Sequence, residues 1–148
     1  MGNMLHITGC MPENWEKALC ELHDDLGFTV GEAGTPVNVC KGDHPSVVCD
    51  GETVTITWAE PVHFYRCLSQ IPQPLAKCDI HEKVGFQACG PMFDCSRNGV
   101  MKVKTLKKWI DIIADLGFNT FLLYTEDTYE IEEEPMFAYL RGKYSKQE

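Results

Sequence analysis

Met92-Phe93-Asp94-Cys95-Ser96-Arg97-Asn98 ends one apolar run, and residues 119–124 form a second, which stops at Thr125-Glu126-Asp127. Residues 105–117, between the two runs, have the periodicity of an amphipathic helix. Strand, helix and strand in this order predict a parallel βαβ unit with a right-handed connection. Barrels and open sheets of this kind place their chemistry at the carboxyl ends of the strands. We therefore expect both charged segments to meet at the mouth of a sheet.

The composition limits the classes of partner. The chain has 148 residues, enough for one ordinary domain or for a small domain and part of another. Its 44% of apolar residues suffices for a real core. A formal net charge of -9 argues against a nucleic-acid partner, because phosphate binding needs clustered Lys and Arg. The arginines are scarce, namely Arg66, Arg97 and Arg141, which draws attention to each of them.

Cysteine usage and the amino terminus bear on localisation. Cysteine stands at positions 10, 20, 40, 49, 67, 78, 89 and 95. Because Val, Ile, Leu and Phe already supply a core, we expect buried thiols and not a disulfide framework. Met1 is followed by polar residues, and no run of eighteen apolar residues occurs. The sequence therefore predicts a cytoplasmic protein without a membrane span, while a signal peptide removed before Met1 remains compatible with it.

The first part of the chain reads as a compact α+β unit. Strands are predicted at residues 4–8, 28–30, 36–40, 46–49 and 53–58, with a hairpin turn at Asp50-Gly51. One amphipathic helix is predicted from Pro12 to a stop at Gly27, and another starts near Pro61 and ends before Pro72. We expect a small antiparallel sheet with both helices on one face. The predicted boundary gives domains 1–83 and 84–148.

The second domain is expected to be incomplete as a fold. Its helix should bury a stripe of Leu106, Ile110, Ile113 and Gly117. The tail, residues 128–148, is acidic at first and then too apolar for a disordered segment, so we expect it to lie on a surface. Two parallel strands with one crossover helix cannot cover both of their own faces. The chain therefore reads as stopping in mid-fold.

Asp94-Cys95-Ser96-Arg97-Asn98, residues 123–129 and the segment 137–144 together resemble the start of the catalytic barrel in family 20 glycoside hydrolases. These are β-N-acetylhexosaminidases, and the match is nearest to their bacterial exo-acting branch. The resemblance covers nearly the whole chain. It implies a non-catalytic α+β domain followed by the first βαβ unit of a truncated (β/α)8 barrel. It also implies removal of a terminal N-acetylated hexosamine from a glycan by substrate-assisted retaining hydrolysis, without a cofactor or metal.

The resemblance also assigns roles to residues. Arg97 matches an arginine that hydrogen-bonds hydroxyls of the terminal sugar, for which its fork of donors is suited. Glu126 or Asp127 matches an acidic pair of which one member orients a histidine, and Asp94 is expected to hold Arg97 in position. The catalytic Asp-Glu pair of the family has no counterpart, because no Asp is followed by Glu. We therefore expect an inactive fragment whose unfinished barrel edge is covered, for instance by self-association.

Other interpretations of the same residues remain open. The α+β domain is alternatively a binding or assembly module, with the βαβ piece as its dimerisation surface. A third hypothesis is a small regulatory domain with a zinc site formed by Cys40, His44 and Cys49 with Cys67 or His63, although the spacing lacks Cys-x2-Cys knuckles. Without the resemblance, Arg97 would be an ion-pair partner of Asp94, and the acidic pair would belong to a solvated loop.

Overall fold

The computed structural model describes residues 3–22, 27–97 and 99–148. By its contacts the chain divides into two compact units. The first unit comprises residues up to 87 together with 114–117, and the second comprises residues 88–113 and 118–148. The boundary predicted at residues 83 and 84 stays a prediction, since a division by contacts does not say which part folds by itself.

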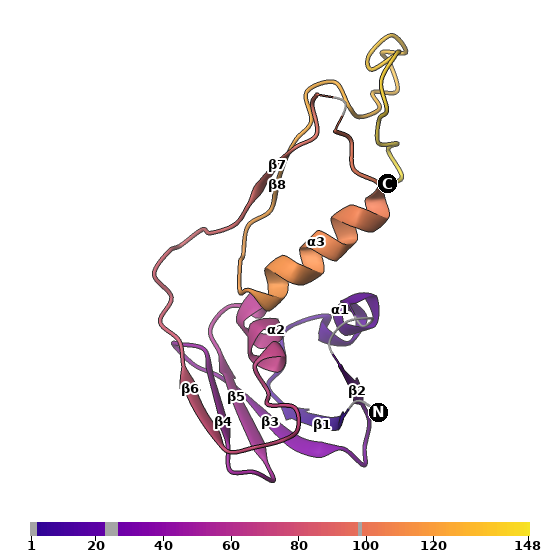
Figure 1. Cartoon of the computed structure of the whole chain (residues 1–148). Helices are drawn as coiled ribbons and strands as arrows, with labels where there is room; N and C mark the ends of the chain where they lie inside the picture. The colour runs from indigo at the N-terminus through magenta and orange to yellow at the C-terminus, as the bar shows by residue number, and fades with distance from the viewer. Residues whose placement is uncertain (1–2, 23–26, 98) are drawn as a thin grey trace. The chain divides into compact units, whose positions relative to one another are not determined.

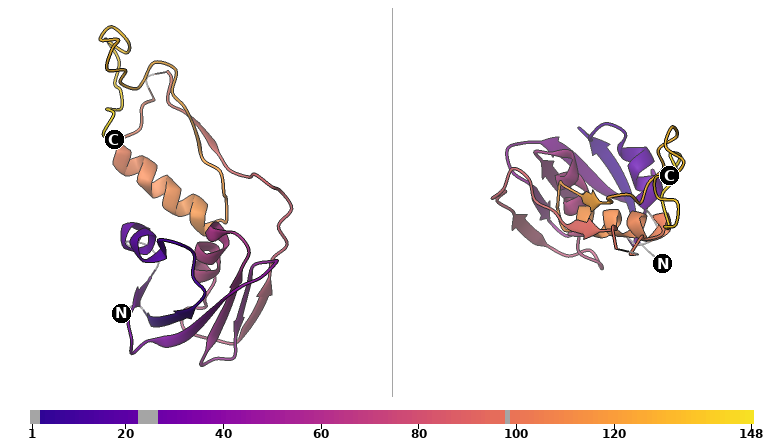
Figure 2. Two further views of the ribbon diagram at one scale, coloured as in Figure 1. Left: turned by 180° about the vertical axis from the view of Figure 1, so that it is seen from behind. Right: turned by 90° about the horizontal axis from the view of Figure 1, so that it is seen from above.

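The first unit is a six-stranded sheet with helices on one face (Figures 1 and 2). Its elements in chain order are β1 (Asn3–Gly9), α1 (Trp15–Leu22), β2 (Phe28–Val30), β3 (Thr35–Lys41), β4 (Ser46–Cys49), β5 (Val54–Trp58), α2 (Pro61–Ser69) and β6 (Cys78–His81). The predicted strands and the start of the second helix at Pro61 are confirmed. The part of the first predicted helix at residues 23–26 lies outside the described residues.

The expectation of an antiparallel sheet was wrong, because the sheet is mixed. The strand order is β2-β1-β3-β5-β4-β6. β1 is parallel to β2 and β3, and β3 is parallel to β5, whereas β4 is antiparallel to β5 and β6. The hairpin at Asp50-Gly51 does form, and Asp50 Oδ1 accepts from the amides of Glu52 and Thr53 at 2.8 Å. Its second strand, however, inserts between β3 and β4, so consecutive strands are not always neighbours.

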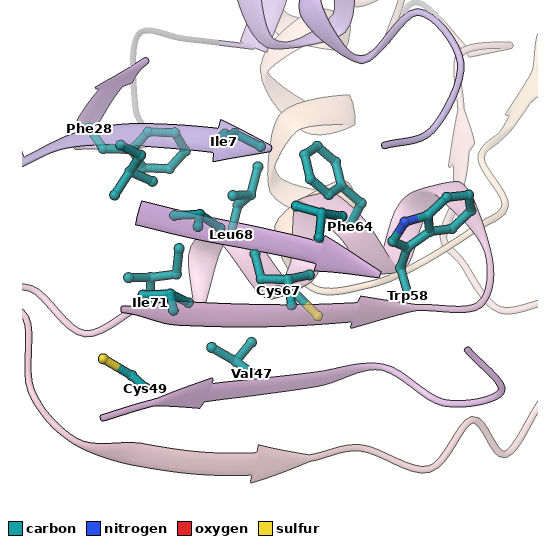
Figure 3. Packing of buried hydrophobic residues seen from close by; sticks show 14 of the residues in the cluster. Ile7, Phe28, Val47, Cys49, Trp58, Phe64, Cys67, Leu68 and Ile71 are labelled. Carbon is teal, nitrogen blue, oxygen red and sulfur yellow. The ribbon is translucent and has the colours of Figure 1, made fainter. Parts of the chain in front are cut away.

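The core of the first unit lies between the sheet and the two helices (Figure 3). Alternate residues of β3 and β5 point into it, as period-2 strands require when one face is covered. Phe64 of α2 is fully buried and meets the edge of the Trp15 ring from α1 at a centroid distance of 6.2 Å. The Trp58 indole is also buried and donates from Nε1 to the Cys10 carbonyl at 2.7 Å. The first unit therefore has a continuous apolar core of its own.

The second unit contains the predicted βαβ motif. β7 (Met92–Asp94) and β8 (Leu122–Tyr124) are parallel, and α3 (Val103–Asp115) connects them. The Trp109 ring of α3 packs on Phe93 of β7 at a centroid distance of 4.9 Å. None of the described helices is long and apolar enough to cross a bilayer.

The β7–β8 sheet has only two strands, so it leaves apolar side chains of its own and of α3 exposed. Met92 and Leu122 remain 62% and 53% exposed, as expected for strands with an uncovered face. The prediction that Ile110 is buried was wrong, since it is 43% exposed and the buried residues of α3 are Leu106 and Ile113. Because the sheet is narrow, it buries only Leu106 and Ile113 of the helix and leaves Ile110 exposed.

Candidate functional site

The candidate site is the edge of the second unit at which β7 and β8 end. Asp94 is the register partner of Tyr124, and the Cys95 amide donates to the Tyr124 carbonyl at 2.8 Å, which extends the pairing by one residue. Arg97 follows β7 and Glu126 follows β8 by only a few positions. The parallel register therefore places all four predicted site residues in the two segments that leave this edge, which we name the rim (residues 94–97 and 124–128).

Asp94 is held by its own loop. Its Oδ1 accepts from the Ser96 amide at 2.8 Å and from the Ser96 hydroxyl at 2.5 Å. These hydrogen bonds from Ser96, and then the nearby charge of Arg97, hold the pKa of the Asp94 carboxyl below its usual value. Ser96 is fully buried, so the turn after β7 has a fixed shape. Asp94 thus secures the loop that carries Arg97, and its direct hydrogen bonds go to Ser96.

Arg97 extends into solvent from this turn. Among the described residues its guanidinium makes no direct ion pair, and its interaction with Asp94 is limited to the charge effect that lowers the Asp94 pKa. A guanidinium carries five donors in a planar fork. An exposed fork of this kind, on a loop fixed by a buried serine, is suited to two neighbouring oxygen atoms of a ligand.

Glu126 adopts a backbone conformation that is rare for its residue type. Its φ is +48°, in the left-handed region, immediately after the strand. Its Oε1 accepts from the Tyr124 hydroxyl at 3.1 Å, and this bond raises the pKa of Tyr124. Strained backbone of this sort occurs more often at functional sites than elsewhere. Glu126 and Asp127 lie in a turn in which Glu126 is exposed and Asp127 is half-buried, so the two acidic residues have different surroundings.

Asp127 is the more enclosed of the two acids. Its Oδ1 lies 3.2 Å from Nη1 of Arg141, an ion pair with both side chains mostly covered. Oδ1 of Asp127 and Nε of Arg141 are buried atoms that make no hydrogen bond within the described part of the chain. The pair is therefore a charge contact without hydrogen-bond geometry. The carboxylate of Asp127 is oriented by a residue fourteen positions further along the chain.

The tail folds back against the rim. Thr128 is fully buried, and its hydroxyl donates to the Thr125 carbonyl at 2.7 Å. The Tyr144 amide donates to the Thr128 carbonyl at 3.0 Å. The Tyr144 hydroxyl donates to the Met101 carbonyl at 2.8 Å, and burial, followed by its contact with Cys95, raises the Tyr144 pKa to about 12. The expectation that the apolar tail lies on a surface holds for Tyr144 but not for Tyr139 and Leu140, which remain 68% and 88% exposed.

The zinc hypothesis finds no support in the geometry. Cys40 is exposed on β3, whereas Cys49 is buried on β4. Cys67 is buried in α2, and its burial raises the thiol pKa to about 12. No group of three or more His, Cys, Asp or Glu side chains among residues 3–22, 27–97 and 99–148 is placed to hold a metal ion.

Sequence reasoning overlooked four residues that shape the rim: Ser96, Tyr124, Arg141 and Tyr144. The scarcity of arginine singled out Arg141, but nothing in the local sequence links it to Asp127. The partners of Tyr144 and Arg141 are distant in sequence, and periodicity reports only local structure. The position of Ser96 two residues after Asp94 was a usable signal, because Asp often accepts from the amide two residues on.

The fold is similar to those of solved β-N-acetylhexosaminidases. A GH20 exo-β-N-acetylglucosaminidase from Vibrio harveyi aligns with a TM-score of 0.71 and 17% identity over 95% of this chain and 26% of that chain. A β-N-acetylhexosaminidase from Bacteroides fragilis gives a TM-score of 0.73 and 15% identity over 99% and 36%. The N-acetyl-β-hexosaminidase of Streptomyces plicatus gives 0.69 and 18% over 99% and 38%.

No family model matches the sequence, and neither does any curated protein sequence. The chain spans between 26% and 38% of these three solved chains. At this level of identity the likeness concerns the fold. Over nearly its whole length the chain has the fold of a part of the GH20 β-N-acetylhexosaminidases, which confirms the resemblance expected from the sequence.

Proposed function

We propose that this chain is the amino-terminal part of an exo-β-N-acetylhexosaminidase that removes terminal N-acetylated hexosamine from glycans. The observation that carries the proposal is the parallel register of β7 and β8, which brings Arg97, Glu126 and Asp127 to one rim. The fold likeness to GH20 enzymes supports the same assignment. In α/β folds of this kind the carboxyl ends of the strands are the usual place for a substrate.

Each rim residue has a role in this proposal. The Arg97 guanidinium donates to two adjacent hydroxyl oxygens of the terminal sugar, because it is exposed and carries no ion pair among the described residues. Asp127, held by Arg141, presents its carboxylate to a group supplied by later parts of the enzyme. Glu126 lies in the turn beside it, and Asp94 keeps the Arg97 loop in shape through Ser96.

The reaction proposed for the complete enzyme is substrate-assisted retaining hydrolysis. The 2-acetamido oxygen of the sugar attacks the anomeric carbon, while one carboxylate orients that group and an adjacent glutamic acid protonates the leaving oxygen. The sequence contains no Asp followed by Glu. We therefore propose that the 148-residue chain binds part of the sugar but does not hydrolyse it by itself.

The test is to measure hydrolysis of a chromogenic β-N-acetylglucosaminide by this chain and by a longer polypeptide that contains it. We expect activity in the longer polypeptide alone. In that active polypeptide Arg97→Ala should lower kcat/KM by roughly 30- to 1000-fold, about 2 to 4 kcal/mol, because charged hydrogen bonds to the sugar are lost. Lys104→Ala, which removes an exposed charge from α3, is the matched control. Unchanged kcat/KM in Arg97→Ala would reject the role given to Arg97.

A second candidate function is an assembly module without catalytic activity. The uncovered apolar residues of the β7–β8 pair, Met92, Leu122 and Tyr124, favour it, since exposed strand faces of this kind often mark contact surfaces. In this case the chain should self-associate. Sedimentation of the purified chain, compared with Met92→Lys and Leu122→Lys variants, tests the assembly module: a monomer removes its basis. A dimer that the substitutions dissociate is expected for both candidates, and hydrolysis by the longer polypeptide then separates them.

A further inference from the structure

Cys49 and Cys78 occupy directly opposed positions on two hydrogen-bonded strands. β4 and β6 are antiparallel, and their register pairs Val47 with Ile80 and Cys49 with Cys78. Opposed residues of a ladder point to the same side of a sheet. Cys49 is buried, and Cys78 is half-buried against the same core cluster. The two thiols therefore lie on the same face of the sheet, against one core cluster, although they are far apart in sequence.

The type of pair follows from the ladder. The Glu82 amide donates to the Pro45 carbonyl at 3.0 Å, so residues 45 and 82 form a hydrogen-bonded pair. Pair types alternate along an antiparallel ladder, and positions 49 and 78 are four steps away. They are therefore also a hydrogen-bonded pair, with Cα atoms about 5.5 Å apart. Disulfides span Cα distances of about 4.4 to 6.8 Å.

From this geometry we propose that Cys49 and Cys78 form a reversible disulfide that fastens β6 to β4. β6 is the edge strand, and β4 is its pairing partner. The Cβ atoms of such pairs lie about 4.5 to 5.5 Å apart, wider than the roughly 3.8 Å mean of disulfides. The bond is consequently strained, and strained disulfides are the ones that ordinary thiols reduce.

The chemistry is a two-step exchange with a small-molecule disulfide such as oxidised glutathione. The half-buried Cys78, as thiolate, attacks one sulfur of the oxidant and releases one glutathione thiolate. The Cys49 thiolate then attacks the Cys78 sulfur of this mixed disulfide and releases the second. Two protein thiols are oxidised and one glutathione disulfide is reduced to two thiols, which take up the two protons.

Because Cys78 is half-buried, we expect this exchange to be slower at neutral pH than at higher pH. Burial first, and the neighbouring Cys49 thiol next, raise the pKa of Cys78 above its ordinary value. Since the thiolate is the attacking species, the rate should rise with pH. The Cys67 and Cys78 thiols each donate to a backbone carbonyl, but Cys67 competes little because it is fully buried and its pKa is raised to about 12, whereas Cys78 is only half-buried.

Peptide mapping tests the proposal directly, since the three candidate thiols of the first unit fall on separate tryptic peptides. Cys49 lies in peptide 42–66, Cys67 in 67–77 and Cys78 in 78–83. The chain, with exposed Cys10, Cys20 and Cys40 changed to Ser, is treated with oxidised glutathione at about pH 8.5, alkylated and digested. We expect peptide 42–66 linked to peptide 78–83, with separation on reduction. Alkylated Cys49 and Cys78 in full yield, or a link to 67–77, would overturn the proposal.

Two variants and a stability measurement complete the test. Cys78→Ser should abolish the cross-link, whereas Cys89→Ser, at another half-buried thiol, should leave it intact. Oxidation should raise the Tm of the chain by about 5 °C, because the link restricts the unfolded state, and should leave the Tm of Cys78→Ser unchanged. A cross-linked chain with a lowered Tm would show that the bond distorts the sheet and would reject its role as a fastening.

Discussion

The first unit packs two helices against a six-stranded sheet, whereas the second unit combines a two-stranded sheet, one helix and a tail around a smaller set of buried apolar side chains. Most of the fully buried apolar side chains belong to the first unit. The second unit buries few of them: Cys95, Leu106, Ile113 and Ala138. Its buried Ser96 and Thr128 instead satisfy loop hydrogen bonds at the rim.

This difference suggests that the first unit supplies most of the stability, whereas the second unit carries the candidate binding residues. A large apolar core supplies most of the stabilisation of a small domain, at roughly 25 cal/mol for each Å² buried. Hydrogen bonds in loops contribute far less net stability, but they fix the orientation of the side chains that the loops carry, and a binding site needs side chains with a defined orientation. The residues with candidate roles in sugar binding all lie in the unit with the smaller core. Substitutions in both units test this contrast.

The largest effect is expected in the core of the first unit. Phe64→Ala should lower the free energy of unfolding by about 3 to 5 kcal/mol, because it leaves a cavity under α2 where Trp15 and Tyr65 now contact the ring. Urea unfolding followed by circular dichroism measures it. Phe86→Ala, which truncates an exposed phenylalanine of the same unit, should change it by less than about 0.5 kcal/mol. Equal losses in the two variants would contradict the packing of Phe64 in the core.

A smaller loss is expected for a buried residue of the second unit. Leu106→Ala removes a side chain that α3 buries against a narrow sheet, so the cost should be near the lower end of the range, about 2 kcal/mol. Hydrogen exchange of the α3 amides reports this loss. Unperturbed exchange in α3 would mean that the helix does not depend on its buried stripe, and the two units would then differ even more in how they are stabilised.

Removal of one hydroxyl tests how the tail is held. Tyr144→Phe deletes the hydrogen bond to the Met101 carbonyl and should cost about 1 kcal/mol, with faster exchange of amides in the rim and little change in the first unit. Tyr139→Phe, at an exposed tyrosine of the same tail, is the control. An equal response of both variants would indicate that the Tyr144 contact does not hold the tail.

The smallest expected effect is a pH dependence of the stability that arises from the Arg66–Glu82 ion pair in the first unit. Arg66 donates to Glu82, 2.7 Å away, and this bond is the main cause that lowers the pKa of Glu82 below 4.5. A carboxyl with a lowered folded-state pKa adds stability above its unfolded pKa, and that stability is lost as the pH falls through the folded value. Both side chains are partly exposed, so the contribution should be at most about 1 kcal/mol.

The measurement is urea unfolding of the chain and of Glu82→Gln at several pH values. The chain should be the more stable of the two near pH 6, and the difference should shrink below about pH 4.5, where the carboxylate becomes protonated. Glu13→Gln, which removes the charge of an exposed glutamate, is the matched control. A constant difference across this range would show that the Arg66 contact does not shift the titration of Glu82.

Local patterns predicted the elements of this fold better than their pairing. Alternation in β3 and β5 and the Asp50-Gly51 turn fixed strand positions, because these signals depend on nearby residues alone. The parallel pairing of β3 with β5 depends on a strand that arrives later and inserts between earlier ones. The edge strand β6 has the composition of a polar linker, since Asp79 and His81 face solvent and leave only two inward residues as a signal.

At the rim, too, local sequence patterns predicted the position of residues but not their contacts. Arg97, Glu126 and Asp127 were predicted as site residues because each stands next to the end of an apolar run, and their roles stay a prediction. The partners that orient them were not, because the contact between Asp127 and Arg141 and the left-handed backbone of Glu126 follow from how the tail returns. A sequence pattern states which side chains a strand end presents, and three-dimensional packing decides how each is oriented.

The return of Tyr144 to the loop after β7 has a consequence for the order of events during translation. The two ends of this contact, Cys95 and Tyr144, are 49 positions apart. At roughly 5 to 20 residues per second, several seconds pass on the ribosome between the emergence of the first end and that of the second. During that interval Tyr144 cannot yet contact Cys95 and Met101, so the nascent segment that carries Arg97 lacks these contacts while chaperones and proteases have access to it.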